Sequence, residues 1–100
     1  MWYHLSPVRT LDQTGISPGT LVGRAVAARK PMPHVYLGTE HYILTQYLEY
    51  VPRGEYHLFS VSTEGIRLQP VLAGTNQVKV SETIPASQVQ YVRTISTIRR

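Results

Sequence analysis

The sequence predicts an α+β fold, a small and mostly antiparallel sheet with one clear helix. Short runs with strand character, separated by turn residues, recur along most of the chain. Only one segment, residues 40–50, shows sustained helical spacing of apolar residues. Strands and helices do not alternate regularly, which argues against a parallel sheet and leaves a single, a split or a two-layered sheet open. A length of 100 residues fits one domain over 1–100.

Strand-like runs account for most of the expected structure. Pro7 ends the first run, because proline cannot supply the backbone N–H that an interior strand needs. For the same reason Gln69-Pro70 is expected to interrupt a strand that begins at Ile66, and residues 84–89 are typical of a corner. The expected strands cover residues 2–5, 34–37, 55–61, 66–68, 77–81 and 90–98.

The expected helix begins after Thr39, a good N-cap, with Glu40 favourably placed in its first turn. Its apolar residues fall on one stripe, which predicts packing of one helix face against the sheet. The stripe consists of Ile43, Leu44, Tyr47, Leu48 and Val51. Pro52-Arg53-Gly54 ends the segment, and a turn or two of helix is expected over residues 8–13.

Residues 17–33 predict a mobile basic loop, because glycine, proline and basic residues dominate and large apolar anchors are few. Arg24, Arg29 and Lys30 are its candidate contacts for a phosphate group or a target molecule. The net charge of +4 likewise favours anionic partners, although a solvated basic surface explains it equally well.

Composition excludes several kinds of site. The chain has no cysteine, so disulfides and thiolate metal ligands are excluded. His34, His41 and His57 fall in different elements without short ligand spacing, so no metal is predicted. No apolar run approaches the length of a membrane span and no secretion signal is recognisable, so a cytoplasmic protein without membrane contact is expected.

Four separated segments together resemble the NAD-binding part of the ADP-ribosyltransferases of the diphtheria-toxin type. They are His4-Leu5-Ser6 after an aromatic residue, Val35-Tyr36-Leu37-Gly38-Thr39, Tyr47 in the helix, and Asn76-Gln77-Val78-Lys79-Val80. The family has a first-strand His, a second-strand Tyr, a second aromatic residue in the following helix, and a late-strand Glu. The resemblance covers most of the chain in order, through short motifs.

The resemblance implies NAD as the cofactor and a protein or nucleic acid as the target. It implies that the nicotinamide ring lies between Tyr36 and Tyr47, that His4 bonds the adenosine ribose, and that the Leu5 backbone pairs with the nicotinamide amide. Ser6 would lie close by. His4, Tyr36 and Gln77 would form the catalytic set. Leu5 replaces a glycine of the family, which alters the approach of ligand to backbone.

Gln77 stands where the family has its catalytic Glu, and it carries no charge to stabilise an oxocarbenium-like state. Glu82 is a weaker candidate acid, since five residues along a strand place it on the opposite side. Three functions therefore remain open: NAD-dependent ADP-ribosyl transfer, an RNA 2′-phosphotransferase activity, and a catalytically impaired module that binds a nucleotide or partner, such as a phage or bacterial inhibitor. Taken singly, His4, Tyr36 and Tyr47 are equally explained as core residues.

Overall fold

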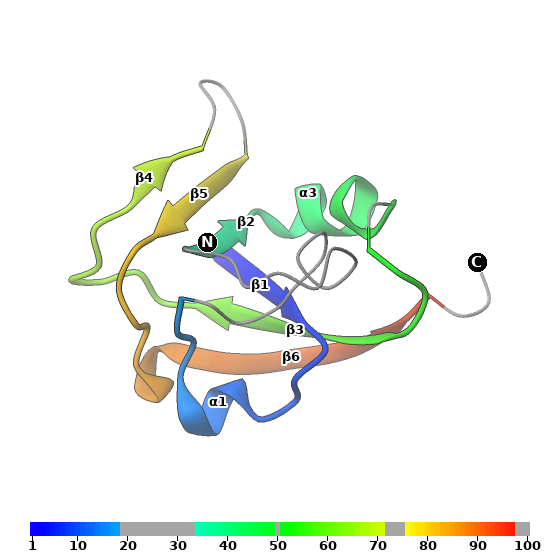
Figure 1. The fold of residues 1–100 in the computed structure, drawn as a ribbon, viewed down its shortest axis with the longest axis horizontal. Helices are drawn as coiled ribbons and strands as arrows, with labels where there is room; N and C mark the ends of the chain where they lie inside the picture. The colour runs from blue at the N-terminus through cyan, green and yellow to red at the C-terminus, as the bar shows by residue number, and fades with distance from the viewer. Residues whose placement is uncertain (19–33, 50, 72–75, 98–100) are drawn as a thin grey trace.

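All the strands of the described chain pair antiparallel in one six-stranded sheet (Figure 1). The computed structural model describes residues 1–18, 34–49, 51–71 and 76–97. The sheet order is β4-β5-β2-β1-β3-β6. The strands are β1 (Trp2–Ser6), β2 (Val35–Gly38), β3 (Glu55–Val61), β4 (Gln69–Pro70), β5 (Gln77–Val80) and β6 (Val89–Ser96). The predicted α+β class is thus confirmed, with a single sheet.

Helix α3 (Glu40–Thr45) is the main helix, and the Thr39 side chain caps it by accepting a hydrogen bond from the Tyr42 N–H at 3.2 Å. It is shorter than predicted, because the chain continues as the 3-10 helix η1 (Tyr47–Glu49). Two further short helices, α1 (Leu11–Thr14) and η2 (Ala86–Gln88), lie at the ends of strands. The strand expected over residues 66–68 was wrong: β4 instead contains Pro70, which an edge strand tolerates.

The two faces of the sheet carry two hydrophobic clusters. One is centred on Phe59 and is closed by residues from α1 and the turns, including Leu11, Ile16 and Ile84. The other lies under α3 and η1. It contains the predicted helix stripe, with Ile43, Leu48 and Val51 buried and Leu44 and Tyr47 packed against them. The stripe prediction is therefore confirmed.

β1 and β2 have the fewest registered residue pairs of any neighbouring strands in the sheet. These neighbouring strands share one registered pair, Tyr3 with Gly38, whereas β1 and β3 are paired along all of β1. α3 packs against Gly38. A Cβ added at this position would lie 3.0 Å from Tyr42 Cδ2 and 3.3 Å from Ile43 Cγ1. The absence of a side chain therefore lets the helix lie close to β2.

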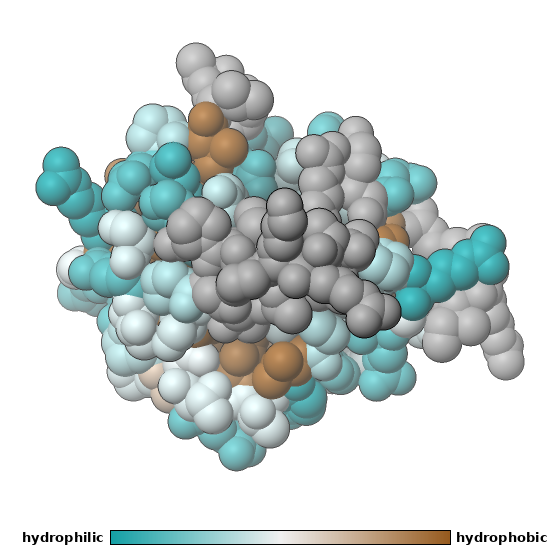
Figure 2. All heavy atoms as spheres, viewed as in Figure 1, coloured by the Kyte–Doolittle hydropathy of each residue, from teal (hydrophilic) through white to brown (hydrophobic). Residues whose placement is uncertain are grey.

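The two outer strands differ in how regular they are. β4 has only two residues, one of them Pro70. β6 is long but irregular, because Leu58 pairs with Arg93 and Phe59 with Tyr91, which leaves Val92 as the extra residue of a β-bulge. Val92 is one of the exposed large apolar residues. On the face shown in Figure 2, apolar atoms of the described residues form small separate areas on a mainly hydrophilic surface.

Two glycines with positive φ provide a test of this packing. Gly15 has φ +83° and an added Cβ would lie 2.6 Å from the Ile84 carbonyl oxygen, whereas Gly65 has φ +74° with open space around it. We expect Gly15→Ala to lower the free energy of unfolding by about 2–4 kcal/mol, from strain and the clash together. Gly65→Ala should cost about 1 kcal/mol from strain alone. Urea unfolding of both variants measures the difference; equal losses would contradict the close contact at Gly15.

Candidate functional site

Most of the residues that the sequence singled out border one cavity between β1, β2, β5 and the α3–η1 segment. They are His4, Leu5, Tyr36, Tyr47 and Gln77, and they are joined by Leu37, Gly38, Tyr42 and Ile43. The cavity has a volume of about 10 Å³. A space of this size holds about one water molecule. The strand and helix positions expected for these residues are therefore brought together around one small space.

His4 is the buried polar residue of this site. It is 2% exposed, and its Nδ1 lies 2.9 Å from the Tyr36 carbonyl oxygen. Because a carbonyl oxygen only accepts, Nδ1 carries the proton and donates it. Burial lowers the pKa of His4, and the hydrogen bond to Tyr36 opposes this in part. The imidazole is therefore neutral near pH 7, with an acceptor lone pair on Nε2.

Nε2 of His4 is buried and has no hydrogen-bond partner. Leaving a buried acceptor unpaired costs about 1–3 kcal/mol. A ligand hydroxyl or N–H that donated to Nε2 would remove this cost. Nε2 can therefore bind a hydrogen-bond donor. An anionic oxygen only accepts and so gains nothing from this atom.

Three tyrosines surround the cavity. Tyr36 comes from β2 and its ring meets His34 edge to face, with ring centres 6.2 Å apart. Tyr42 and Tyr47 come from α3 and η1, with ring centres 6.4 Å apart. Tyr42 was not singled out from the sequence; its position four residues after Gly38, on the helix that packs on this glycine, is the signal that could have identified it.

Gln77 begins β5 directly opposite Gly38, and Lys79 lies opposite Tyr36. Since alternate residues of a strand share a face, Gln77, Lys79, Tyr36 and Gly38 lie on the same side of the sheet. The side chain of Lys79 makes no ion pair or hydrogen bond within the described part of the chain. The residues that border the cavity include no Asp or Glu.

The second candidate acid, Glu82, does not border this cavity. It is exposed, and its Oε1 accepts a hydrogen bond from the Arg67 N–H at 3.4 Å. Gln77 therefore remains the residue at the position where the resemblance implies an acid, and this position carries no negative charge.

His4 reaches this site from the other face of the sheet. It pairs with Phe59, which belongs to the first cluster, so alternation directs its side chain to that face, opposite to Tyr36 and Gln77. Both sets border the same cavity because it lies at the junction where β1 and β2 have a single registered pair.

Ser6 does not border this cavity. Ser6 is fully buried, and its hydroxyl accepts a hydrogen bond from the Val8 N–H at 3.0 Å, so it stabilises the turn after β1. The proposed cofactor contact of Ser6 thus has no support from its position. Arg24, Arg29 and Lys30, with most of the predicted loop over 17–33, lie outside the described residues.

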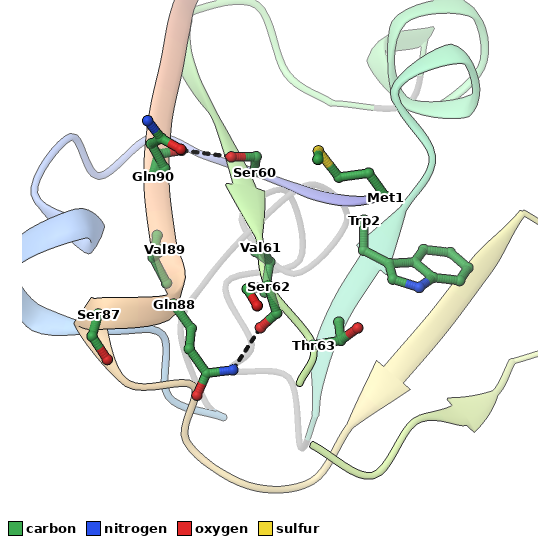
Figure 3. Close-up of a pocket in the computed structure, with 10 residues that line it drawn as sticks. All are labelled: Met1, Trp2, Ser60, Val61, Ser62, Thr63, Ser87, Gln88, Val89 and Gln90. Atoms are coloured by element: carbon green, nitrogen blue, oxygen red, sulfur yellow. Dashed lines mark hydrogen bonds between the residues drawn. The ribbon is translucent and has the colours of Figure 1, made fainter. Parts of the chain in front are cut away.

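A second and larger cavity, about 570 Å³ in volume, lies at the end of the sheet where β1 starts and β3 ends (Figure 3). Its residues come from three separate segments without a recognisable motif, so no sequence pattern pointed to it. It is bordered by Met1, Trp2, Ser60, Val61, Ser62, Thr63, Ser87, Gln88, Val89 and Gln90.

The lowered pKa of His4 predicts the direction of a pH effect on stability. The folded-state pKa of His4 lies below the unfolded value of 6.5, so as the pH falls the unfolded chain takes up the proton first. The contribution of His4 to the free energy of unfolding is therefore fully present above pH 6.5 and is lost as the pH drops below it. We expect the free energy of unfolding, measured by urea titration, to fall between pH 7.5 and 5. The fall should be smaller in His4→Asn and unchanged in His41→Asn, an exposed helix position. Equal falls in all three proteins would contradict the assignment.

Within the described part of the chain, no helix is both long and apolar enough to cross a bilayer, and no cluster of residues suits a metal ion. Comparisons with protein-family models, with curated proteins and with solved structures gave no match. The function is therefore argued from the residues and geometry of this chain.

Proposed function

We propose that the cavity beside β1 and β2 binds the nicotinamide and ribose end of NAD, and that the chain is an ADP-ribosyltransferase-like protein with little transferase activity of its own. The observation that carries the proposal is the convergence of His4, Tyr36, Tyr47 and Gln77 on one cavity. These residues are far apart in the sequence. His4 also carries a buried acceptor atom, Nε2, without a partner.

The chemistry of the site suits such a ligand. The tyrosine rings offer faces and edges to a planar heterocycle, and aromatic pairs add about 0.5–1.5 kcal/mol beyond area burial. Nε2 of His4 accepts from a ribose hydroxyl or an amide N–H. Lys79, on the same face as Tyr36, provides a positive charge for a phosphate group.

The small volume of this cavity indicates which segment must move when the ligand binds. A cavity of about 10 Å³ does not admit a nicotinamide ring, so binding requires the α3–η1 segment to separate from β2. Tyr42 and Tyr47 are half-buried and lie on this segment, so their side chains are the ones to be displaced. Ligand affinity is reduced by the free energy of this opening.

Gln77 limits the chemistry. Cleavage of the bond between nicotinamide and ribose develops positive charge on the ribose, which a nearby carboxylate stabilises. Gln77 can bond a hydroxyl but adds no charge, and no carboxylate is found among the described residues that border the cavity. Binding without efficient transfer follows from this set of residues.

The second candidate, an RNA 2′-phosphotransferase activity, draws support from the unpaired Lys79 and the neutral Gln77 on the same face. Incubation with RNA bearing a 2′-phosphate tests it directly. Loss of that phosphate in the presence of NAD, without release of nicotinamide from NAD alone, would favour this candidate over the first.

Binding of NAD is tested with a substitution that distinguishes the roles of the two ring nitrogens of His4. His4→Asn keeps a donor near the Nδ1 position for the Tyr36 carbonyl and removes the acceptor at Nε2. We expect it to weaken NAD binding at least about tenfold, which is the loss of about 1.4 kcal/mol. Saturation-transfer NMR and calorimetry provide the measurements.

His41→Asn is the matched control, because His41 is exposed on α3 and does not border the cavity. It should leave NAD affinity unchanged. Thermal unfolding of both variants identifies any general loss of structure. If millimolar NAD shows no contact with the wild-type protein, the proposed function is wrong.

Transfer chemistry is tested by restoring the charge. We expect Gln77→Glu to raise the rate of nicotinamide release from NAD at least about tenfold, since electrostatic groups at reacting centres typically contribute more than this. Gln13→Glu adds the same charge at an exposed position of α1 and should have no effect. Nicotinamide release is followed by chromatography. Equal rates in wild type and Gln77→Glu, with NAD bound to both, would show that Gln77 does not lie at the reacting bond.

A further inference from the structure

Next to the small cavity, one face of β2, β5 and β4 carries polar and aromatic side chains. The opposite face of these strands is apolar, because Val35, Leu37 and Val80 belong to the first hydrophobic cluster. Alternation therefore directs the residues between them to the other side, which we call the polar face. In Figure 1 the described helices lie away from β4 and β5. The partly exposed side chains of the polar face are His34, Tyr36, Gln77, Lys79 and Gln69.

The strand register arranges these residues in rows that lead away from the small cavity. Gln77 stands in the first row and borders the cavity. The second row contains Tyr36, Lys79 and Gln69, each opposite the next. His34 is one row further, and its ring meets that of Tyr36 with the centres 6.2 Å apart. Since two residues of an antiparallel strand span about 7 Å, the polar face extends about 14 Å from the cavity to His34.

Lys79 supplies the positive charge in the middle of the polar face. Its side chain makes no ion pair or hydrogen bond within the described residues. No residue of the polar face is acidic, and Glu82, the acidic residue nearest to Lys79 in the sequence, accepts a hydrogen bond from the Arg67 N–H instead. The ammonium group is therefore available to a phosphate that lies beside Tyr36.

His34 places a second unpaired nitrogen next to Tyr36. Its Nδ1 is buried without a hydrogen-bond partner, as is Nε2 of His4, and the described residues contain no other such side-chain atom. Both histidines contact Tyr36, His4 through the backbone carbonyl and His34 through the ring. A hydroxyl both donates and accepts, so a sugar hydroxyl pairs with Nδ1 in either tautomer of His34.

We propose that the polar face binds the diphosphate and the second ribose of the dinucleotide whose nicotinamide end occupies the small cavity. The phosphates lie at Lys79, and a hydroxyl of the second ribose bonds to Nδ1 of His34. The inference rests on the proposed function and adds a specificity to it, namely preference for a dinucleotide over a mononucleotide. It also departs from the resemblance, which implies His4 as the partner of the adenosine ribose.

Fragments of the ligand test how far binding extends along the polar face. Calorimetry on the full chain compares NAD with nicotinamide mononucleotide, which ends at the first phosphate, and with nicotinamide riboside, which has no phosphate. We expect NAD to bind at least about tenfold more tightly than the mononucleotide, because only NAD reaches His34. The mononucleotide should bind at least about threefold more tightly than the riboside, because only its phosphate meets the charge of Lys79.

Two variants assign the two halves of the polar face. Lys79→Gln removes the charge and should weaken binding of NAD and the mononucleotide at least about fivefold, with the riboside unchanged. His34→Phe keeps an aromatic ring beside Tyr36 but removes Nδ1. It should weaken NAD at least about fivefold and leave the mononucleotide unchanged. A purely structural role would change the affinity for all three ligands together.

Arg53→Gln and His41→Phe are the matched controls, because both residues are exposed and lie outside the small cavity and the polar face. Each should keep all three affinities within about twofold of wild type, since neither residue touches the site. Thermal unfolding checks that every variant is folded. His34→Ala takes the place of His34→Phe if the larger side chain unfolds the protein.

The outcomes separate this inference from the proposed function. If NAD binds no more tightly than nicotinamide riboside, or if the Lys79 and His34 variants bind NAD as well as wild type, the inference is overturned and the nicotinamide site stands. Equal losses for all three ligands in these variants overturn it as well. A wild-type protein that binds no NAD contradicts the proposed function and this inference together.

Discussion

The hydrogen bond from His4 Nδ1 to the Tyr36 carbonyl oxygen is the contact on which the proposed NAD site depends. It joins β1 to β2, where the backbone ladder has a single registered pair. Strands β3 and β6 lie on one side of this junction, and β5 and β4 on the other. A buried side chain thus takes over part of the connection that backbone groups provide elsewhere in the sheet. It also fixes the tautomer of the imidazole, and so decides that the free nitrogen is an acceptor.

Gly38 determines how closely α3 approaches β2 in the same region. Because it lacks a side chain, Tyr42 and Ile43 lie almost against the β2 backbone. The helix therefore covers the cavity closely, and the volume left is that of about one water molecule. This closeness imposes a cost on any ligand larger than water. For the proposed ligand, that cost is the separation of two packed elements.

Much of the fold could be predicted from the sequence, because the signals were local. Strand character over residues 55–61 matched β3, and the Thr39 cap and the helix stripe placed α3 and its buried face. Pro70 was misleading, since proline excludes an interior strand but not an edge strand, and a local pattern does not show where the edge lies. Sheet order is likewise set by contacts between distant segments.

The two cavities also differ in how far local sequence patterns indicate them. The residues near His4 share an order that resembles that of a known family, whereas the larger cavity beside Trp2 has no motif. Tyr42 was missed because its neighbour Ile43 and the other apolar residues explained the helix without it. Ser6 was placed at the site because it follows His4 and Leu5, but its hydroxyl serves the next turn. Proximity in sequence indicates the element that carries a residue, not the face or the partner of its side chain.

The ends of the sheet have a consequence for the protein at high concentration. An exposed outer strand offers free N–H and C=O groups to another chain, and long flat edges promote aggregation. Here one outer strand has only two residues, with Pro70 as one of them, and the other is distorted by the extra residue Val92. Neither provides a long regular template for a foreign strand. A small sheet with this many strands is thereby discouraged from growing by edge-to-edge addition of further copies, and the exposed Val92 lies at a distorted position instead of on a continuous apolar edge.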